Sequence, residues 1–435
     1  MISESPRADR WRSASAHRDH DAGSRLYQGW KVVACAFLIA VFGWGFGFYR
    51  IGVFLAELVE RHGWATSSVA SAVTVLYLVG AVLIAFVGNA FERFGPRRVV
   101  LAGIAAMGAA AIGLTWITHP WQLYVVFPLM AVGWAAMSGA ALNLIVAPWF
   151  ERRRGLAISI AFNGAAVGGV LLVPALVFLI GRIGFKAAVC SLVAVMVGVL
   201  TPLVLWLLVR GPEVLGLAPD GDPAAPRAPG KTAGGGARQT RDFMRTWHFW
   251  SVALPFALGL TAQISIIIHQ VSFLKPTLGT EGAAWAVSLT SVCAVLGRLA
   301  VGSFVDRVNR RAVIAGNFLL QAMSIVLMLS GSGPVLLYVA CAMFGLGVGN
   351  TTSLPSVIVQ AEFPKAAFAQ VVSTIIAINQ FTYSFGPGLL GWLRDGFGSY
   401  DAAFVGCLLL QLAATAILLG GARRGTAVTP APARG

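Results

Sequence analysis

Charged side chains are scarce in this chain. Of its 435 residues, 57% are hydrophobic and only 11% are charged, whereas a soluble domain carries about 25% charged residues. A chain this long and this apolar has more apolar surface than a soluble core can hide. The composition therefore excludes an ordinary soluble protein and predicts a protein that is embedded in lipid.

The residues that would build a metal centre or an enzyme active site are also lacking. The five cysteines all fall in apolar segments, and none has the spacing of metal ligands. There is no phosphate-binding loop with a lysine, no cluster of histidine and cysteine, and no close pair of carboxylates. We therefore expect no metal, no cofactor and no enzymatic activity, and an ATP-driven pump is excluded with them.

Acidic residues are outnumbered by basic ones. The chain has 32 Lys and Arg against 17 Asp and Glu, which gives a formal net charge of +15. In a soluble protein this balance would suggest a nucleic-acid partner. Here the basic residues lie in short clusters between apolar runs, which is the pattern of membrane topology. We expect a lipid bilayer as the partner and no nucleic acid.

Twelve apolar runs are long enough to cross a bilayer as helices, which takes about 20 residues each. They cover residues 30–58, 66–90, 98–118, 121–147, 154–180, 185–209, 247–274, 284–305, 311–331, 334–360, 367–393 and 400–421. The predicted organisation is a disordered cytoplasmic N-terminus (1–28), a six-helix bundle (29–209), a Pro- and Gly-rich cytoplasmic linker (210–245), a second six-helix bundle (246–422) and a cytoplasmic tail (423–435). We expect the chain to work as a monomer.

The basic residues also predict the orientation. Cytoplasmic loops collect Lys and Arg, and most of them lie in the termini, the linker and the alternate loops that share their side. The opposite loops hold only Arg61, Arg182, Lys186, Lys275 and Arg394. We therefore place both termini in the cytoplasm, with the protein in the inner (plasma) membrane.

A loop motif follows the second run and returns after the eighth. Its first copy consists of Gly88, Glu92, Arg93, Gly95, Arg97 and Arg98, and its second copy contains Gly302, Asp306 and Arg307, with Asn309 in place of the inner glycine. This motif resembles that of the major facilitator superfamily, and its repetition is typical of parallel six-helix halves. The resemblance implies an all-α membrane protein of twelve transmembrane helices in two pseudo-symmetric six-helix bundles. It also implies that the motif residues form a cytoplasmic conformational latch, although the arginines could simply set the topology.

A narrower resemblance covers most of the first half. Gly29-Trp30-Lys31 opens the first run, and Pro148-Trp149-Phe150 with Arg152, Arg153, Leu156 and Ala157 precedes and opens the fifth. These elements are similar to the monocarboxylate transporter and oxalate/formate antiporter branch of the superfamily. The resemblance implies a carrier of small organic anions.

Two arginines lie inside the predicted spans, Arg50 in the first and Arg298 in the eighth. A charge at mid-membrane costs at least about 2.5–3.5 kcal/mol, so each should face a cavity or a partner. By the resemblance, both match basic residues that bind a substrate carboxylate. The alternatives are a snorkelling Arg50 near the outer surface and a structural ion pair for Arg298, although no Asp or Glu lies deep in any predicted span.

The sequence departs from the animal monocarboxylate pattern at Ala294, where those carriers have an aspartate. Proton coupling through an Asp–Arg pair is thereby placed in doubt. His269, in the seventh span, is an alternative carrier of a coupled proton, but a lone histidine is more often a hydrogen-bonded packing residue. The eleventh span lacks the basic residue of oxalate carriers and offers Asn379 and Tyr383 instead.

The predicted substrate site therefore consists of Arg50, Arg298, His269, Asn379, Tyr383 and Tyr49, although polar residues also join helices inside membranes. The predicted function is secondary active transport of small organic anions, in particular monocarboxylates, by alternating access. Symport, exchange, uniport, import and export stay open. Two other functions are a carrier or drug exporter for another cargo, and a non-transporting sensor of the same fold.

Overall fold

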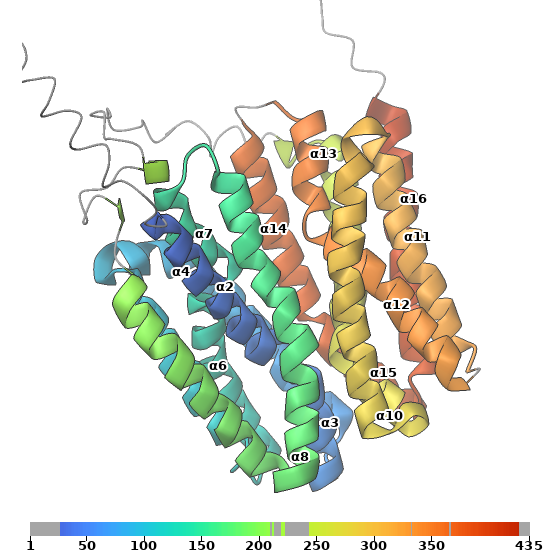
Figure 1. Ribbon diagram of the computed structural model, residues 1–435. Coiled ribbons are helices and arrows are strands. Elements are labelled where there is room, and N and C mark those ends of the chain that lie inside the picture. The colour runs from blue at the N-terminus through green and yellow to red at the C-terminus, as the bar shows by residue number, and fades with distance from the viewer. Residues whose placement is uncertain are drawn as a thin grey trace, which may run out of the picture.

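The computed structural model describes residues 27–208, 211–212, 219–221, 243–331, 333–364 and 367–425. Every regular element in these ranges is a helix. In chain order they are α2 (Gln28–Trp44), η1 (Gly45–Tyr49), α3 (Ile51–His62), α4 (Thr66–Phe94), α5 (Pro96–Gly113), η2 (Pro120–Gln122), α6 (Leu123–Ala136), α7 (Gly139–Val146), η3 (Ala147–Trp149), α8 (Arg154–Leu207), η5 (Pro219–Gly221), α10 (Trp247–Phe304), η6 (Val305–Arg307), α11 (Arg310–Leu329), α12 (Gly333–Thr351), α13 (Leu354–Glu362), α14 (Phe368–Ser384), α15 (Gly386–Phe397) and α16 (Asp401–Gly425). They form two bundles side by side, the first coloured blue to green and the second yellow to red (Figure 1).

Two of these helices are too long to be single spans. α8 has 54 residues and α10 has 58, and at about 1.5 Å per residue each would be more than twice as long as the roughly 30 Å hydrocarbon core. Each contains one glycine with a positive φ, Gly184 at 79° and Gly279 at 71°. A side chain would be strained in that conformation, and the chain turns back there. α8 and α10 therefore supply two spans each.

Four other spans are broken in mid-course. In the first span, η1 is a π-helix, because the Arg50 N–H donates to the Gly45 carbonyl oxygen at 3.0 Å, five residues back. The other three breaks separate α6 from α7, α12 from α13, and α14 from α15. Nine helical stretches in the described chain are long and apolar enough to cross a membrane. When the two reversals and the α14–α15 span are included, they account for the predicted twelve, and the predicted fold class is confirmed.

Glycines of the fifth and tenth spans allow close approach to neighbouring helices. A Cβ atom at Gly164 or Gly168 of α8 would overlap backbone oxygens of α2, and one at Gly349 of α12 would overlap the Ala294 oxygen of α10. Without side chains at these positions, the helix backbones lie against each other. This contact fixes the depth at which side chains of α2 and α10 face the interior.

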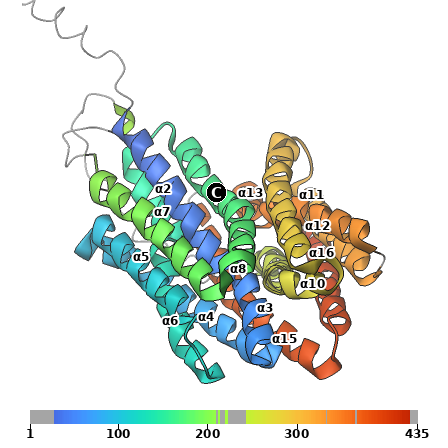
Figure 2. The same cartoon turned by 60° about the horizontal axis from the view of Figure 1, so that its bottom comes forward.

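The start of α2 and the end of α16 lie at the same end of the bundles, called the terminal end below (Figure 1). The other end, called the closed end, is formed by α3, the start of α4, the turn in α10 and the end of α15 (Figure 2). An even number of spans requires such an arrangement of the termini. Their placement in the cytoplasm stays a prediction.

The contacts that join the two halves gather toward the closed end. Lys275 pairs with Glu60, and the Ser67 N–H donates to Asp395 Oδ2 at 2.6 Å. Ser288 Oγ donates to the Val170 oxygen at 3.2 Å. At the terminal end of the same helices, Glu92 and Arg93 are exposed. The halves are therefore drawn together at one end.

The predicted linker and the predicted disordered termini lie mostly outside the described residues. Within the linker, Asp220 accepts backbone N–H groups of Glu151 and Arg152 at 2.9 and 2.8 Å, just before α8 begins. Burial alone would raise the pKa of the Asp220 carboxyl, but the N–H groups of Arg152, Glu151 and Arg153 hold it below its usual value. This part of the linker therefore packs against the start of the fifth span.

Candidate functional site

Arg50 follows the π-helical break in the first span, and its side chain is completely buried. Its Nε donates to the Leu172 carbonyl oxygen of α8 at 3.2 Å, and its guanidinium lies 3.9 Å from the centre of the Phe46 ring. Within the described residues, Nη1 and Nη2 have no hydrogen-bond partner. Such complete burial excludes a side chain that snorkels to the surface. A buried charge is normally paired, so a buried guanidinium with two unpartnered nitrogens is unusual.

Arg298 lies on the returning arm of α10 and is partly buried. Its Nε donates to the Gly349 carbonyl oxygen of α12 at 2.9 Å. That distance depends on the close approach of α10 and α12, because a Cβ at Gly349 would overlap Ala294. In the part of the chain that the structure describes, no carboxylate forms an ion pair with Arg298. The structural ion pair that was the alternative reading thus has no partner there.

Tyr49 connects the surroundings of the two arginines. It precedes Arg50 in the chain and lies close enough to Arg298 for the two groups to interact electrostatically. Its ring lies against Gly169 of α8, next to Ser291 of α10. Tyr49 therefore lies where the first half meets the second.

An aromatic cluster continues from Tyr49 across the interior. It consists of Phe48, Tyr49, Tyr77, Trp134 and Tyr383. Ring centres of Phe48 and Tyr49 are 5.1 Å apart, and Phe48 stacks on Trp134 at 6.4 Å. Tyr77 of α4 contacts Tyr383 of α14 edge-on at 6.0 Å, which joins the two halves. Phe48 and Trp134 could not be selected from the sequence, because aromatic residues are ordinary in lipid-facing helices.

Asn379 and Gln380 add polar groups on α14, the helix that carries Tyr383. Asn379 is buried, and its Oδ1 has no partner among the described residues. Gln380 Oε1 accepts a hydrogen bond from the Tyr383 hydroxyl. Its Nε2 has no hydrogen-bond partner among the described residues. Buried polar atoms are normally hydrogen-bonded, so these two are available to a bound molecule.

His269 lies apart from this group. Its Nδ1 is 3.2 Å from the Tyr400 hydroxyl, and its Nε2 donates to the Pro387 carbonyl oxygen at 3.0 Å. The next peptide N–H, that of Gly388, donates to Thr74 Oγ1 in the first half at 3.2 Å. Both ring nitrogens are thus bonded within the protein near the closed end. The arrangement favours the packing alternative for His269 over direct contact with a substrate.

Among the latch side chains that the structure describes, none has a contact that bridges the halves. Gly95 adopts φ 84° where α4 gives way to α5, so the motif needs a glycine at that point. Arg97 Nε donates to the Leu208 carbonyl oxygen at 3.1 Å, within the first half. Arg98 and Arg307 are exposed, and the side chain of Asp306 lies outside the described residues. Gly88 has open space around it.

A buried ion pair in the second half was not predicted from the sequence. Arg311 donates through Nε and Nη2 to the two oxygens of Glu362, both at 2.7 Å. It also donates to the Leu418 carbonyl oxygen at 2.7 Å and to Ser251 Oγ at 3.1 Å. Arg311 ends the repeated loop motif, as Arg98 ends its first copy, but Glu362 lies outside that motif. One side chain thereby joins four spans at the terminal end.

Comparison with known proteins places these features in a family. The sequence profile of the Major Facilitator Superfamily matches residues 33–281 and 264–435. Monocarboxylate transporter 11 of Mus musculus is 31% identical over 412 residues, which cover 90% of this chain and 87% of that protein. The gallate transporter of Pseudomonas putida is 27% identical over 390 residues, or 82% and 84% of the two chains.

The fold is likewise similar to solved transporters. A bacterial homologue of the human lysosomal transporter Spinster, in an inward-facing and occupied conformation, superimposes with a TM-score of 0.70. The match covers 94% of this chain and 100% of that one, at 16% identity. At this level of identity, the likeness shows the fold alone.

Proposed function

Because the chain belongs to the Major Facilitator Superfamily and resembles its monocarboxylate transporters, we propose that it is a secondary carrier of small organic anions, with a monocarboxylate as substrate. The observation that carries the proposal is the burial of Arg50 with two unpartnered guanidinium nitrogens. No other described side chain offers a buried cation in this condition. A carboxylate is the anion that a planar guanidinium binds with two parallel hydrogen bonds.

The proposed substrate site consists of Arg50, Arg298, Tyr49, Tyr383 and Asn379. The two arginines supply the charge, and Tyr49 precedes Arg50 in the chain and interacts electrostatically with Arg298. Asn379 and Tyr383 are the contribution of α14, in the second half, to this site. His269 is omitted because both of its nitrogens are occupied.

The aromatic cluster favours a planar or aromatic substrate over a small aliphatic one. Aromatic rings prefer offset or edge-on neighbours with centres about 4.5–7 Å apart, and the rings of the cluster, which include Tyr49 next to Arg50, already have that spacing. A relative whose name gives an aromatic monocarboxylate, gallate, supports the same choice. We propose an aromatic monocarboxylate such as benzoate as the preferred class.

In alternating access, contacts between the two halves would break at one end of the carrier while others form at the opposite end. In this state the closed end is held by the Lys275–Glu60 pair, the Ser67–Asp395 bond and the Thr74–Gly388 bond. Opening it would require closure of the terminal end, where Glu92, Arg93 and Arg307 are free to meet the opposite half as a latch. If the termini lie on the cytoplasmic side of the inner membrane, the closed end is the outer end of the carrier, and this conformation is inward-facing.

Uptake of labelled benzoate, lactate and oxalate into proteoliposomes tests this function. We expect saturable benzoate uptake that exceeds lactate uptake, and little oxalate uptake because α14 has no third basic residue. Parallel assays with and without a pH gradient distinguish proton symport from exchange. Absence of flux for all three acids, together with transport of a neutral solute, would contradict the proposal.

A further inference from the structure

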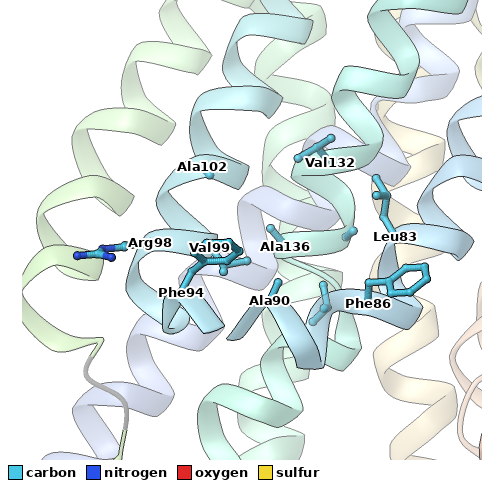
Figure 3. Close-up of a pocket in the computed structure, with 11 residues that line it drawn as sticks. Leu83, Phe86, Ala90, Phe94, Arg98, Val99, Ala102, Val132 and Ala136 are labelled. Carbon is cyan, nitrogen blue, oxygen red and sulfur yellow. The ribbon is translucent and has the colours of Figure 1, made fainter. Parts of the chain in front are cut away.

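A groove of about 400 Å³ lies on the first half, on the side of α4, α5 and α6 near the terminal end. Figure 3 shows side chains from these three helices around it, with Arg98 at one edge, its guanidinium directed away from the other lining side chains, and apolar groups elsewhere. Arg98 is the one charged residue among the eleven that line it. Arg50 and Arg298 do not line it, so the groove is separate from the proposed substrate site.

The groove faces the surroundings of the protein. Phe86 is 59% exposed, Phe94 is 49% exposed and Val132 is 39% exposed. Large apolar side chains exposed on spanning helices face lipid, because the exposure of such an apolar patch to water is unfavourable. The molecules available to fill the groove are therefore those of the bilayer.

Its length fits one leaflet. Leu83 and Phe94 line the groove from the same helix, eleven positions apart, which corresponds to about 16 Å along α4. The hydrocarbon of one leaflet is about 15 Å deep, half of the roughly 30 Å core. Arg98 comes just after the α4–α5 turn, at the depth where headgroups begin.

The charge at the mouth selects among lipids. Arg97, the neighbour of Arg98, is turned to the Leu208 carbonyl oxygen, whereas Arg98 is exposed at the groove. Arg93 lies 5.3 Å from the centre of the Phe94 ring at the same edge. A guanidinium binds phosphate oxygens through parallel hydrogen bonds, and basic residues next to a membrane span attract acidic lipids.

We propose that this groove is a binding site for an acidic phospholipid of the leaflet at the terminal end. One acyl chain lies between α4, α5 and α6, and Arg98 binds the headgroup phosphate. The site holds α4 against α5 next to the first copy of the loop motif. Its occupancy does not depend on the identity of the transported substrate.

Native mass spectrometry of the purified full-length chain, with equal phosphatidylglycerol and phosphatidylcholine in mixed micelles, tests the proposal. We expect preferential retention of phosphatidylglycerol. Arg98→Gln should weaken it about fivefold, the effect of removing one basic residue at a membrane surface. Ala102→Phe, which fills the groove from its exposed wall, should reduce retention at least as much.

Matched controls separate the groove from the general surface. Arg154→Gln removes an exposed arginine at the start of α8, and Ala109→Phe enlarges an exposed alanine of α5 outside the groove. Both should retain phosphatidylglycerol as the wild type does. Equal retention of the two lipids, or unchanged retention in Arg98→Gln, would overturn the proposal. If Ala102→Phe fails to purify, Arg98→Gln decides alone, because its side chain is exposed.

Discussion

Replacing Arg50 by glutamine is expected to lower anion uptake at least about 30-fold while leaving the empty carrier no less stable. The loss follows from removing one partner of a buried charge pair, which costs about 2–5 kcal/mol in binding. The stability follows from the same burial, because the empty carrier holds a cation without a counterion. Proteoliposome uptake gives the first quantity, and the thermal unfolding midpoint without substrate gives the second.

Arg61→Gln is the matched control for Arg50. Arg61 lies on α3, pairs with Glu57 at 3.0 Å, and its side chain is 44% exposed, so its loss should change uptake and stability little. Two results would contradict our interpretation of Arg50. One is uptake that survives Arg50→Gln, and the other is a large fall in its unfolding midpoint, which would indicate a structural role.

Arg311→Gln is expected to have the opposite signature, with a large loss of stability. Arg311 is the most connected buried cation of the second half, with a bidentate bond to Glu362 and two further acceptors. Breaking a buried pair by removing one partner costs about 3–5 kcal/mol, and partial exposure of Glu362 reduces this to about 2–4. The thermal unfolding midpoint should fall clearly, and the yield of folded protein with it.

A double replacement provides the control for Arg311. Arg311→Met with Glu362→Leu removes both charges and keeps similar volume, so no charge is left alone in the interior. We expect the double variant to be more stable than Arg311→Gln. If both variants are as stable as the wild type, the pair contributes nothing to the fold, and its role must lie in the conformational cycle.

The fold could be predicted from the sequence because membrane insertion depends on length and hydropathy, which are local properties. The twelve runs, the repeat of Gly88 as Gly302 and the glycines of the fifth and tenth spans all follow from residue type and spacing. The π-helical break before Arg50 could not be predicted in this way. Its segment, Gly45–Tyr49, contains two glycines, which weaken an α-helix but do not specify a π-helix.

The candidate site was predictable only in part, for a related reason. Arg50 and Arg298 stand out because a charge is expensive in lipid. Phe48 and Trp134 do not stand out, because their chemistry matches the rest of the helix, and only packing brings them to Tyr77. The role of His269 also depends on contacts with residues more than 100 positions away, which the sequence does not give.

The coupling of transport to a gradient depends on the groups near Arg298 that could carry a proton. Ala294 stands where animal monocarboxylate carriers have an aspartate, and no described carboxylate pairs with Arg298. A proton carried by an Asp–Arg pair is therefore not the coupling that we propose. The pH-gradient arm of the uptake assay addresses this point, and a pH-independent exchange would remove symport.

The central claim is that Arg50 and Arg298 bind a carboxylate. The direct test is equilibrium binding of benzoate and of its neutral amide, benzamide, to the purified carrier by calorimetry. We predict that benzoate binds, that benzamide binds at least about 30-fold more weakly, and that Arg50→Gln and Arg298→Gln each remove the difference. Equal binding of the acid and the amide by the wild type would contradict the claim.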